Sequence, residues 1–244
     1  MSNIKSNIEN LTSLWRTASE PFDSYFSETD FNYSLIENSE WPNRLWFHND
    51  INEAKISLAK EKISSTPTIL TVPYWNIYNS NSFQLLEENG FTLKFEQIGM
   101  SLKPNHSFTE LSGLNLKKVS TKKETELWSV LFSKSFGYFI SPILLNKCQE
   151  NTNYYIVYYN NEAIGTAILH ITNKTVGIHS VGIIPKQRRK GYAEQVMKLL
   201  INQSIEINSD YITLQSSKMG KDLYLKLGFE EQFTIKNYAL QQSV

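Results

Sequence analysis

Hydrophobic residues recur every three to four positions in several segments of the chain, which is the spacing of an amphipathic helix. The clearest stripe lies in residues 191–207 and comprises Ala193, Val196, Met197, Leu200, Ile201 and Ser204. On this pattern, together with glycine and proline signals at the segment ends, we expect helices at residues 8–26, 53–63, 82–89, 121–135, 141–148, 191–207 and 219–227.

Runs rich in β-branched and aromatic residues alternate with these helices and predict strands. They lie at residues 68–72, 91–102, 154–159, 163–171, 176–184, 211–215 and 229–240. Asn160-Asn161 and Asn173-Lys174 separate three of these runs at hairpin distances, so we expect an antiparallel meander. The strand–helix–strand passage over residues 176–215 predicts a parallel crossover, and the two features together predict a mixed α/β (α+β) fold.

Composition excludes several classes of protein. The 244 residues are 41% hydrophobic, and 24 Lys and Arg balance 24 Asp and Glu, so the chain has no overall attraction to nucleic acid or to an anionic membrane. The single Cys148 excludes an intrachain disulfide, and the scattered histidines predict no metal site. With no signal-peptide pattern and no long apolar run, we expect a soluble, cytoplasmic protein.

One segment carries recognisable chemistry. A predicted strand ends at Pro185, a basic turn follows, and a helix opens at Gly191. The first turn of a helix offers free N–H groups and a positive dipole end, and glycine allows close approach, so the segment is suited to a pyrophosphate. The chain has no GxxxxGK[ST] or GxGxxG motif, which disfavours the Walker and Rossmann phosphate sites. A solvated basic turn is the alternative.

The pattern Arg188-x-x-Gly191-x-Ala193 resembles the acetyl-CoA loop of the GNAT N-acetyltransferases, Q/R-x-x-G-x-G/A. Residues 214–229 are similar to the C-terminal motif of that family, S/N-x-x-G/A-x-x-x-Y-x-x-x-G-F, and follow the loop by one helix and one strand. The resemblance covers residues 121–240, about half of the chain. It implies a GNAT fold, acetyl-CoA as cosubstrate, and direct acetyl transfer to a primary amine in a ternary complex.

The resemblance also implies residue roles. The pyrophosphate would be held by the loop residues Arg188, Arg189, Lys190, Gly191, Tyr192 and Ala193. The main chain of Val181 and Ile183 would lie beside the pantetheine and acetyl groups, with Gly182 either admitting the ligand or forming a bulge. Ser217 stands where many members have an asparagine that touches the cofactor.

Of the groups that would transfer protons, the sequence suggests an acid but no base. Tyr224, four residues before Gly228, matches the tyrosine that commonly protonates the departing thiolate, although an aromatic filling the core is the alternative. No base is assigned. By strand alternation we expect His179 to share a face with Val181 and Ile183, where a water relay and a purely structural role are both open, and we expect Glu162 to be solvated. The aromatic segment 136–141 either lines an acceptor pocket or covers the sheet.

The first half of the chain contains an echo of the second. Aligning Gly90 with Gly228 pairs Phe91 with Phe229 without gaps, and a strand precedes each helix. No R-x-x-G-x-A loop occurs before residue 105. We therefore predict two GNAT-like halves in tandem: a degenerate or accessory domain at residues 1–105 that binds no CoA, a linker and start of the second domain at 106–120, and a catalytic domain at 121–244.

These observations favour an acetyl-CoA-dependent N-acetyltransferase that acts on a small-molecule or peptide amine, with no nucleic-acid or membrane partner. A non-catalytic CoA-binding sensor is the main alternative, because no base is evident. A nucleic-acid or protein-binding module that uses the basic turn is a second, and the zero net charge counts against it.

Overall fold

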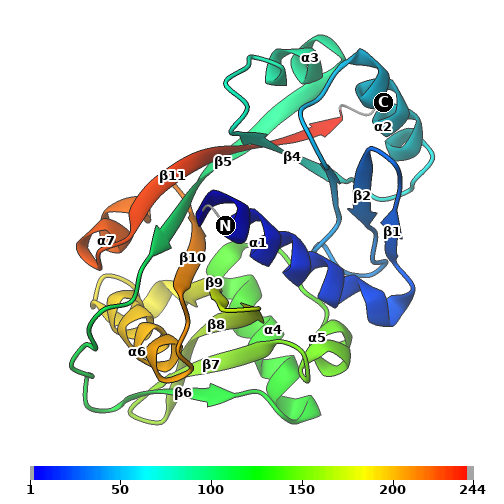
Figure 1. Cartoon of the computed structure of the whole chain (residues 1–244). Helices are drawn as coiled ribbons and strands as arrows, with labels where there is room; N and C mark the ends of the chain where they lie inside the picture. The colour runs from blue at the N-terminus through cyan, green and yellow to red at the C-terminus, as the bar shows by residue number, and fades with distance from the viewer. Residues whose placement is uncertain (1–2, 241–244) are drawn as a thin grey trace.

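The structure, a computed structural model, describes residues 3–240 and has the predicted mixed α/β architecture. One sheet contains the strands in the order β1-β2-β3-β4-β11-β5-β10-β9-β8-β7-β6 (Figure 1). The strands are β1 (Tyr25–Ser27), β2 (Phe31–Ser34), β3 (Arg44–Phe47), β4 (Thr71–Asn76), β5 (Phe91–Leu102), β6 (Leu114–Lys118), β7 (Asn153–Tyr159), β8 (Glu162–Thr172), β9 (Thr175–Ile183), β10 (Tyr211–Ser216) and β11 (Glu230–Leu240). The α-helices are α1 (Asn3–Ser19), α2 (Glu53–Ser64), α3 (Phe83–Glu88), α4 (Lys122–Phe136), α5 (Pro142–Cys148), α6 (Tyr192–Glu206) and α7 (Lys221–Lys226), and short 3₁₀ turns are η1 (Glu20–Phe22) and η2 (Pro185–Gln187).

The predicted meander is confirmed. Strands β6 to β9 pair antiparallel in chain order. The two hairpins turn at Asn160-Asn161 and at Asn173, all with positive φ, a conformation that asparagine tolerates better than most residues. Strand β9 then leads through η2 and α6 to β10, which pairs with β9 in parallel, as the crossover prediction required.

The two halves exchange strands. The order β4–α3–β5 in the first half matches β10–α7–β11 in the second, as expected for tandem halves. Strand β5 inserts between β10 and β11, and β11 inserts between β4 and β5, all antiparallel. Leu240 lies opposite Phe91 and Glu230 opposite Ser101, so each strand begins where the other ends. In Figure 1 this pair is the long ribbon that joins the two halves.

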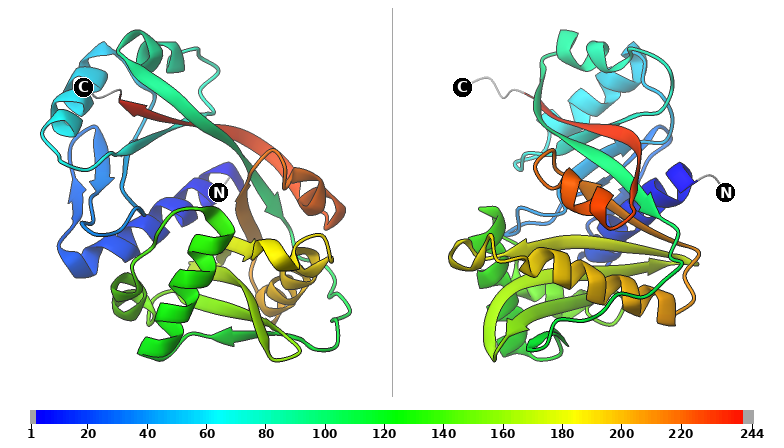
Figure 2. Two further views of the ribbon diagram at one scale, coloured as in Figure 1. Left: turned by 180° about the vertical axis from the view of Figure 1, so that it is seen from behind. Right: turned by 90° about the vertical axis from the view of Figure 1, so that its left-hand side faces the viewer.

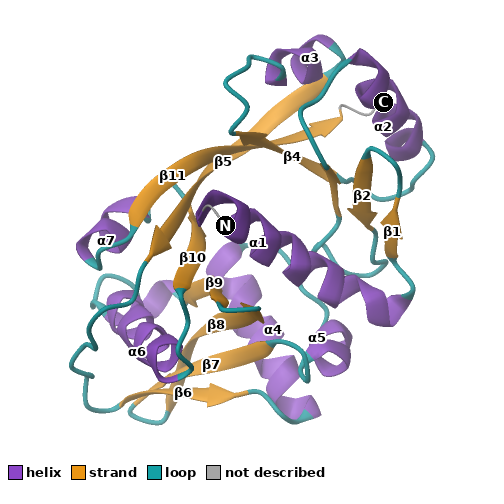
Figure 3. Ribbon diagram, viewed as in Figure 1, coloured by secondary structure: helices purple, strands orange, loops and turns teal. Residues whose placement is uncertain are grey.

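Helices cover both faces of the meander. Leu14 of α1, Phe132 of α4 and Leu144 of α5 share one hydrophobic cluster with Ile168 of β8, whereas α6 packs in a second cluster that includes Ile178. The two views of Figure 2 show α1 and α6 on opposite sides of these strands. As Figure 3 shows, the whole sheet curves around α1, a helix from the first half that packs on β8, β9 and β10 of the second.

Some elements differ from the prediction. The first helix occupies Asn3–Ser19 rather than residues 8–26, because Pro21 lies in the 3₁₀ turn Glu20–Phe22 that follows and Asp23 is left-handed, with φ 53°. The strand expected at 68–72 lies at Thr71–Asn76. Strands β1, β2, β3 and β6 were not predicted; β6 lies at the end of the expected linker, and all four are short. Within residues 3–240 no helix has the length and apolar character needed to cross a membrane.

Candidate active site

The parallel strands β9 and β10 separate part-way along their length. Their paired residues are Tyr211 with Thr175, Ile212 with Val176 and Thr213 with Gly177. Beyond these pairs β9 continues to Ile183 and β10 to Ser216, each held on its other side by β8 or β5. The facing edges of the two strands therefore carry main-chain groups that do not pair with each other.

The amides of Val181 and Ile183 point into this gap. The N–H of Ile184 donates to the carbonyl of Ile164 on β8 at 2.9 Å. Because successive N–H groups along a strand point in opposite directions, that of Ile183 faces away from β8 and toward β10. The carbonyl of Ser180 accepts from Thr166 Oγ1 on β8 at 3.1 Å, so the N–H of Val181, at the opposite side of the same peptide group, also faces away from β8. These are the two main-chain positions that the sequence predicts beside a thioester.

Gly182 lies between them and faces the other way. A Cβ atom at this position would collide with the ring of Phe136 and the side chain of Ser135, both on α4. The glycine is therefore required by the packing of α4 on β9. Of the two readings that the sequence left open, ligand approach and bulge, the pairing supports the bulge: Gly182 opposes Thr166 and His179 opposes Ile168, so β9 carries one extra residue between these two pairs.

The predicted phosphate loop lies directly after β9. Arg189 and Gly191 both have positive φ, 62° and 79°, and α6 begins at the next residue. Gly191 has no side chain to cap the helix, and apart from its two chain neighbours no described residue comes within 4 Å of the place where its Cβ would be. Tyr192 and Ala193 therefore lie in the first turn of α6, where N–H groups have no partner within the helix, and the N-terminus of this helix is uncovered at Gly191.

The three basic residues of the loop behave differently. Arg188 is exposed but bound to the main chain: its Nε donates to the carbonyl of Ile183 at 3.0 Å and its Nη2 to the carbonyl of Ser135 at 2.7 Å. It joins the loop to β9 and α4, so its charge is not directed at the helix entrance. Lys190 donates to Gln187 at 2.7 Å, and Arg189 is exposed.

Tyr224 stands on α7, beyond the end of β10. Its ring packs edge-on against Phe229, with centroids 6.0 Å apart, and a Cβ at Gly220 would lie 3.3 Å from its Cε2. No residue in the described part of the chain is within hydrogen-bond distance of its hydroxyl. Burial raises the pKa of Tyr224 to about 12, so at neutral pH the hydroxyl is protonated and free to donate.

A family model, that of the acetyltransferase (GNAT) family, matches residues 120–229, the segment that contains the strand divergence, the loop and Tyr224. This segment is a GNAT acetyltransferase domain. Acetyl transfer from acetyl-CoA to an amine is the general reaction of the family. No curated protein matches the sequence.

Solved structures extend the likeness beyond the GNAT domain. A GCN5-related N-acetyltransferase from Kribbella flavida has a TM-score of 0.73 at 14% identity, and the match covers 97% of each chain. Another from Sphaerobacter thermophilus has a TM-score of 0.63 at 13% identity and covers 89% of this chain and 79% of its own. A GCN5-related N-acetyltransferase-like protein from Streptococcus suis has a TM-score of 0.58 at 12% identity over 96% and 100%. At these identities the likeness establishes the fold, and it includes the first half.

His179 of the GNAT domain does not lie where alternation predicted. It opposes Ile168, whose side chain packs on the α1 and α4 face, whereas Val181 and Ile183 pack on the α6 face. The expectation of a shared face is wrong because Ser180 is left-handed, with φ 52°, and breaks the period-two pattern.

The environment of His179 is closed. Its Nδ1 contacts Gln215 Oε1 and its Nε2 contacts Asn10 Oδ1, each at 3.1 Å. Burial lowers the pKa of His179 to about 3. Both ring nitrogens thus face amide oxygens; the neutral ring has one N–H and donates to one of them, and this closed environment leaves neither nitrogen for the predicted water relay. Glu162 is exposed, as expected, and accepts a hydrogen bond from Gln187 at 3.0 Å.

Ser217 of the GNAT domain is exposed at the end of β10. Its Oγ accepts from the N–H of Gly220 at 3.2 Å, which shapes the turn before α7. The aromatic segment 136–141 is tied to the first half: the N–H of Phe139 donates to Glu40 Oε2 at 2.6 Å, and the N–H of Glu40 donates to the carbonyl of Phe139 at 3.0 Å. Sequence reasoning gave no role to Glu40, or to Asn10 and Gln215.

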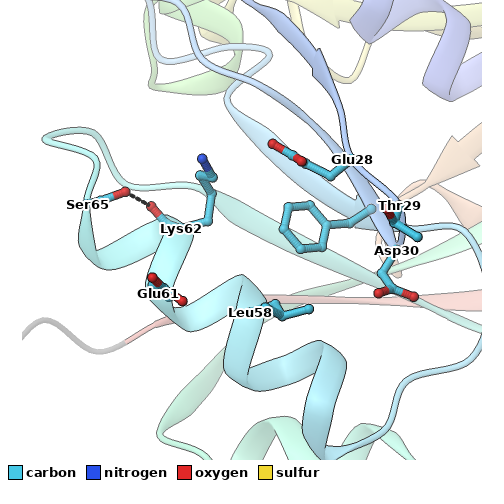
Figure 4. Close-up of a pocket in the computed structure, with 8 residues that line it drawn as sticks. Glu28, Thr29, Asp30, Leu58, Glu61, Lys62 and Ser65 are labelled. Carbon is cyan, nitrogen blue, oxygen red and sulfur yellow. Dashed lines mark hydrogen bonds between the residues drawn. The ribbon is translucent and has the colours of Figure 1, made fainter.

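A separate cavity of about 340 Å³ lies in the first half, between the β1–β2 hairpin and α2. Figure 4 shows the carboxylates of Glu28, Asp30 and Glu61 around it, with Lys62 at one side. It draws its lining from residues 28–65 and belongs to neither β9 nor β10, so it is not part of the site described above.

Proposed function

We propose that the chain is an acetyl-CoA-dependent N-acetyltransferase that acylates a primary amine of a small molecule or peptide by direct attack in a ternary complex. The observation that carries the proposal is the divergence of β9 and β10, with two unpaired amides beside an open helix start. The motif match within the GNAT domain supports the same assignment.

The residues present fit acetyl-CoA. The main chain from Gly191 to Ala193 would hold the pyrophosphate, and the exposed Arg189 and Lys190 would add positive charge. Arg188 acts indirectly, by fixing the loop to β9 and α4. Acetyl-CoA, when bound, supplies an activated acyl thioester.

The amides of Val181 and Ile183 would donate hydrogen bonds toward the acyl carbonyl, where negative charge develops during transfer. Tyr224 would hold a proton for the departing sulfur, since its hydroxyl is protonated at neutral pH and accepts or donates to no described residue. We assign no side-chain base: His179 is closed off, so the amine would enter neutral or lose its proton to water.

Isothermal titration with acetyl-CoA tests the proposal. The native chain should bind, and Gly191→Glu should abolish binding through steric conflict and charge repulsion at the phosphate seat, the main chain from Gly191 to Ala193 that would hold the pyrophosphate. Lys186→Gln is a matched control, because it also changes the charge by one unit but lies on η2, outside the seat. Binding by Gly191→Glu equal to that of the native chain would contradict the assigned loop.

A thiol-release assay with a panel of primary amines separates catalysis from binding. Thiol release that depends on both an amine and the native chain supports the transferase. Intact acetyl-CoA binding without turnover on any amine would favour the non-catalytic sensor.

A further inference from the structure

A row of buried and half-buried polar side chains lies between α1 and the point where β9 and β10 separate. Gln215 Nε2 donates to Asn7 Oδ1 at 2.7 Å, and Gln215 Oε1 lies 3.1 Å from His179 Nδ1. His179 Nε2 lies 3.1 Å from Asn10 Oδ1. We call these four residues, Asn7, Asn10, His179 and Gln215, the α1 seam.

The α1 seam spans the strand divergence itself. The last parallel pair is Thr213 with Gly177, and Gln215 and His179 each lie two residues farther along. Their side chains therefore connect β9 to β10 where the backbones no longer pair. Gly177 makes room for this contact, since a Cβ there would collide with Asn10 Oδ1 and His179 Nε2.

Helix α1 is also anchored on β8 and β5, the strands that flank β9 and β10. Asn10 Nδ2 donates to the carbonyl of His170 on β8 at 3.1 Å, and Asn7 Nδ2 donates to the carbonyl of Met100 on β5 at 3.0 Å. Asn7 and Asn10 are completely buried and lie on the same side of α1 as Leu14. Apolar side chains would fill this stripe without the desolvation cost that a buried amide carries, so simple packing of α1 does not require them.

The seam also adjoins the amides that face the gap. Val181 follows His179 by two residues and Ile183 by four, and Ser217, just beyond the end of β10, follows Gln215 by two. A change in the spacing of His179 and Gln215 would move both walls of the divergence relative to each other. The phosphate loop is farther along the chain and is fixed separately, by Arg188.

We propose that Asn10, His179 and Gln215 are positioning residues that set the width of the β9–β10 divergence for the pantetheine and acetyl parts of acetyl-CoA. This inference rests on the proposed function. It makes α1, a helix of the first half, part of the binding machinery of the GNAT domain. The residues act through the main chain of β9 and β10.

Two ligands separate this role from a general loss of structure. Acetyl-CoA uses both the phosphate seat and the divergence, whereas ADP carries a pyrophosphate but no pantetheine. In the full chain, Asn10→Leu keeps a similar side-chain volume and removes the amide. We expect its Kd for acetyl-CoA to rise about tenfold, the scale of one lost buried hydrogen-bond partner, while its Kd for ADP stays within about twofold of native.

Gln215→Met removes the amide at the other end of the bridge and should give the same split; it tests the proposal independently if Asn10→Leu does not fold. Ser13→Ala is the matched control. Ser13 is also on α1 and lies 3.1 Å from His170 Nε2, away from the divergence, so neither Kd should change. In ¹H–¹⁵N spectra, Asn10→Leu should shift the Val181 and Ile183 amides, and Ser13→Ala should not.

Each other outcome counts against the proposal. If either seam variant binds acetyl-CoA with native affinity, or loses acetyl-CoA and ADP in equal proportion, the positioning role is overturned while the proposed function stands. If the native chain fails to bind acetyl-CoA, both are overturned.

Discussion

Trp15 of α1 stacks on Trp75 of β4, with ring centroids 6.1 Å apart and planes inclined by 19°. The contact covers the place where the first half would have its own strand divergence. Strands β3 and β4 run parallel and share a single pair, Arg44 with Thr71, and Trp46 of β3 joins the same aromatic cluster at 5.3 Å from Trp15. One helix thus reaches the divergence of the second half with Asn10 and covers that of the first half with Trp15.

We expect one acetyl-CoA per chain, bound in the second half. Besides the tryptophans, the helix that follows β3 has no open entrance: Asn52 caps α2 by accepting from Lys55 N at 3.0 Å, and Glu53 places a carboxylate in the first turn. Calorimetric stoichiometry checks this, with Gly191→Glu reducing it to zero. A second equivalent of bound ligand that survives Gly191→Glu would show that the first half also binds.

Tyr224→Phe should lower turnover at least about tenfold while changing the Kd for acetyl-CoA less than about twofold, because it removes a proton donor and keeps the ring. Turnover is measured with an amine that the thiol-release assay identifies. Tyr155→Phe, on the face of the meander that packs against α6, is the control. Equal turnover of Tyr224→Phe and the native chain would assign the proton to water or another group.

The pH profile follows from the same residue. Because the pKa of Tyr224 is raised to about 12, its hydroxyl keeps its proton through the range in which a tyrosine of ordinary pKa begins to ionise. The acceptor amine loses its proton as the pH rises. We therefore expect kcat/KM to increase with pH and then to level off, without an alkaline decline up to about pH 10. A decline centred below that pH would contradict the assigned donor.

Two buried histidines should make the fold sensitive to acid. Burial lowers the pKa of His170 to about 4 and that of His179 to about 3, against an ordinary value of 6.5. Below about pH 6.5 the unfolded chain therefore binds protons that the folded chain does not. This contribution to stability is complete above pH 6.5 and is lost as the pH falls toward 4, by about 1.4 kcal/mol per pH unit for each histidine.

Urea unfolding at several pH values measures this slope. His170→Gln/His179→Gln should flatten it between pH 6.5 and 4.5. His48→Gln/His106→Gln, at two exposed positions, is the control and should leave the slope as it is. An unchanged slope in the first double variant would show that other groups govern the acid response.

Cutting the chain between the halves should not separate them. Strand β5 belongs to the first fragment and lies between β10 and β11 of the second. Both of its edges therefore form main-chain hydrogen bonds with the other fragment. A protease site placed between Asn105 and His106, in the exposed connection, should give two fragments that co-elute in gel filtration and separate only in denaturant. Separation in native buffer would contradict the strand exchange.

The sequence predicted what depends on local pattern. The β5 strand has its expected bounds, Phe91–Leu102, and the meander, the α6 crossover and the open glycine at residue 191 are all present. The pairing of β5 with β10 was not predicted, because the alternation of a strand does not specify which distant strand lies beside it. Short strands such as β1, with three residues, give too little pattern to detect.

Errors at the site have the same local origin. A single left-handed residue, Ser180, put His179 on the opposite face, and nothing in the residue type required that conformation. Arg188 was placed at the phosphate by its charge, and no sequence signal indicates that its guanidinium also donates to two main-chain carbonyls. Asn7 and Asn10 did leave a signal: two amides three residues apart among the apolar positions of a helix are costly unless they have buried partners.

The reciprocal placement of β5 and β11 has a consequence for biosynthesis. A ribosome makes β4, α3 and β5 well before β11, yet β11 is the strand that lies between β4 and β5. The leading half therefore cannot close its sheet by itself while the trailing half is still being translated, and vectorial, module-by-module folding is not open to this chain. Both halves should reach their native pairing in one late, concerted step, after residues 230–240 have emerged.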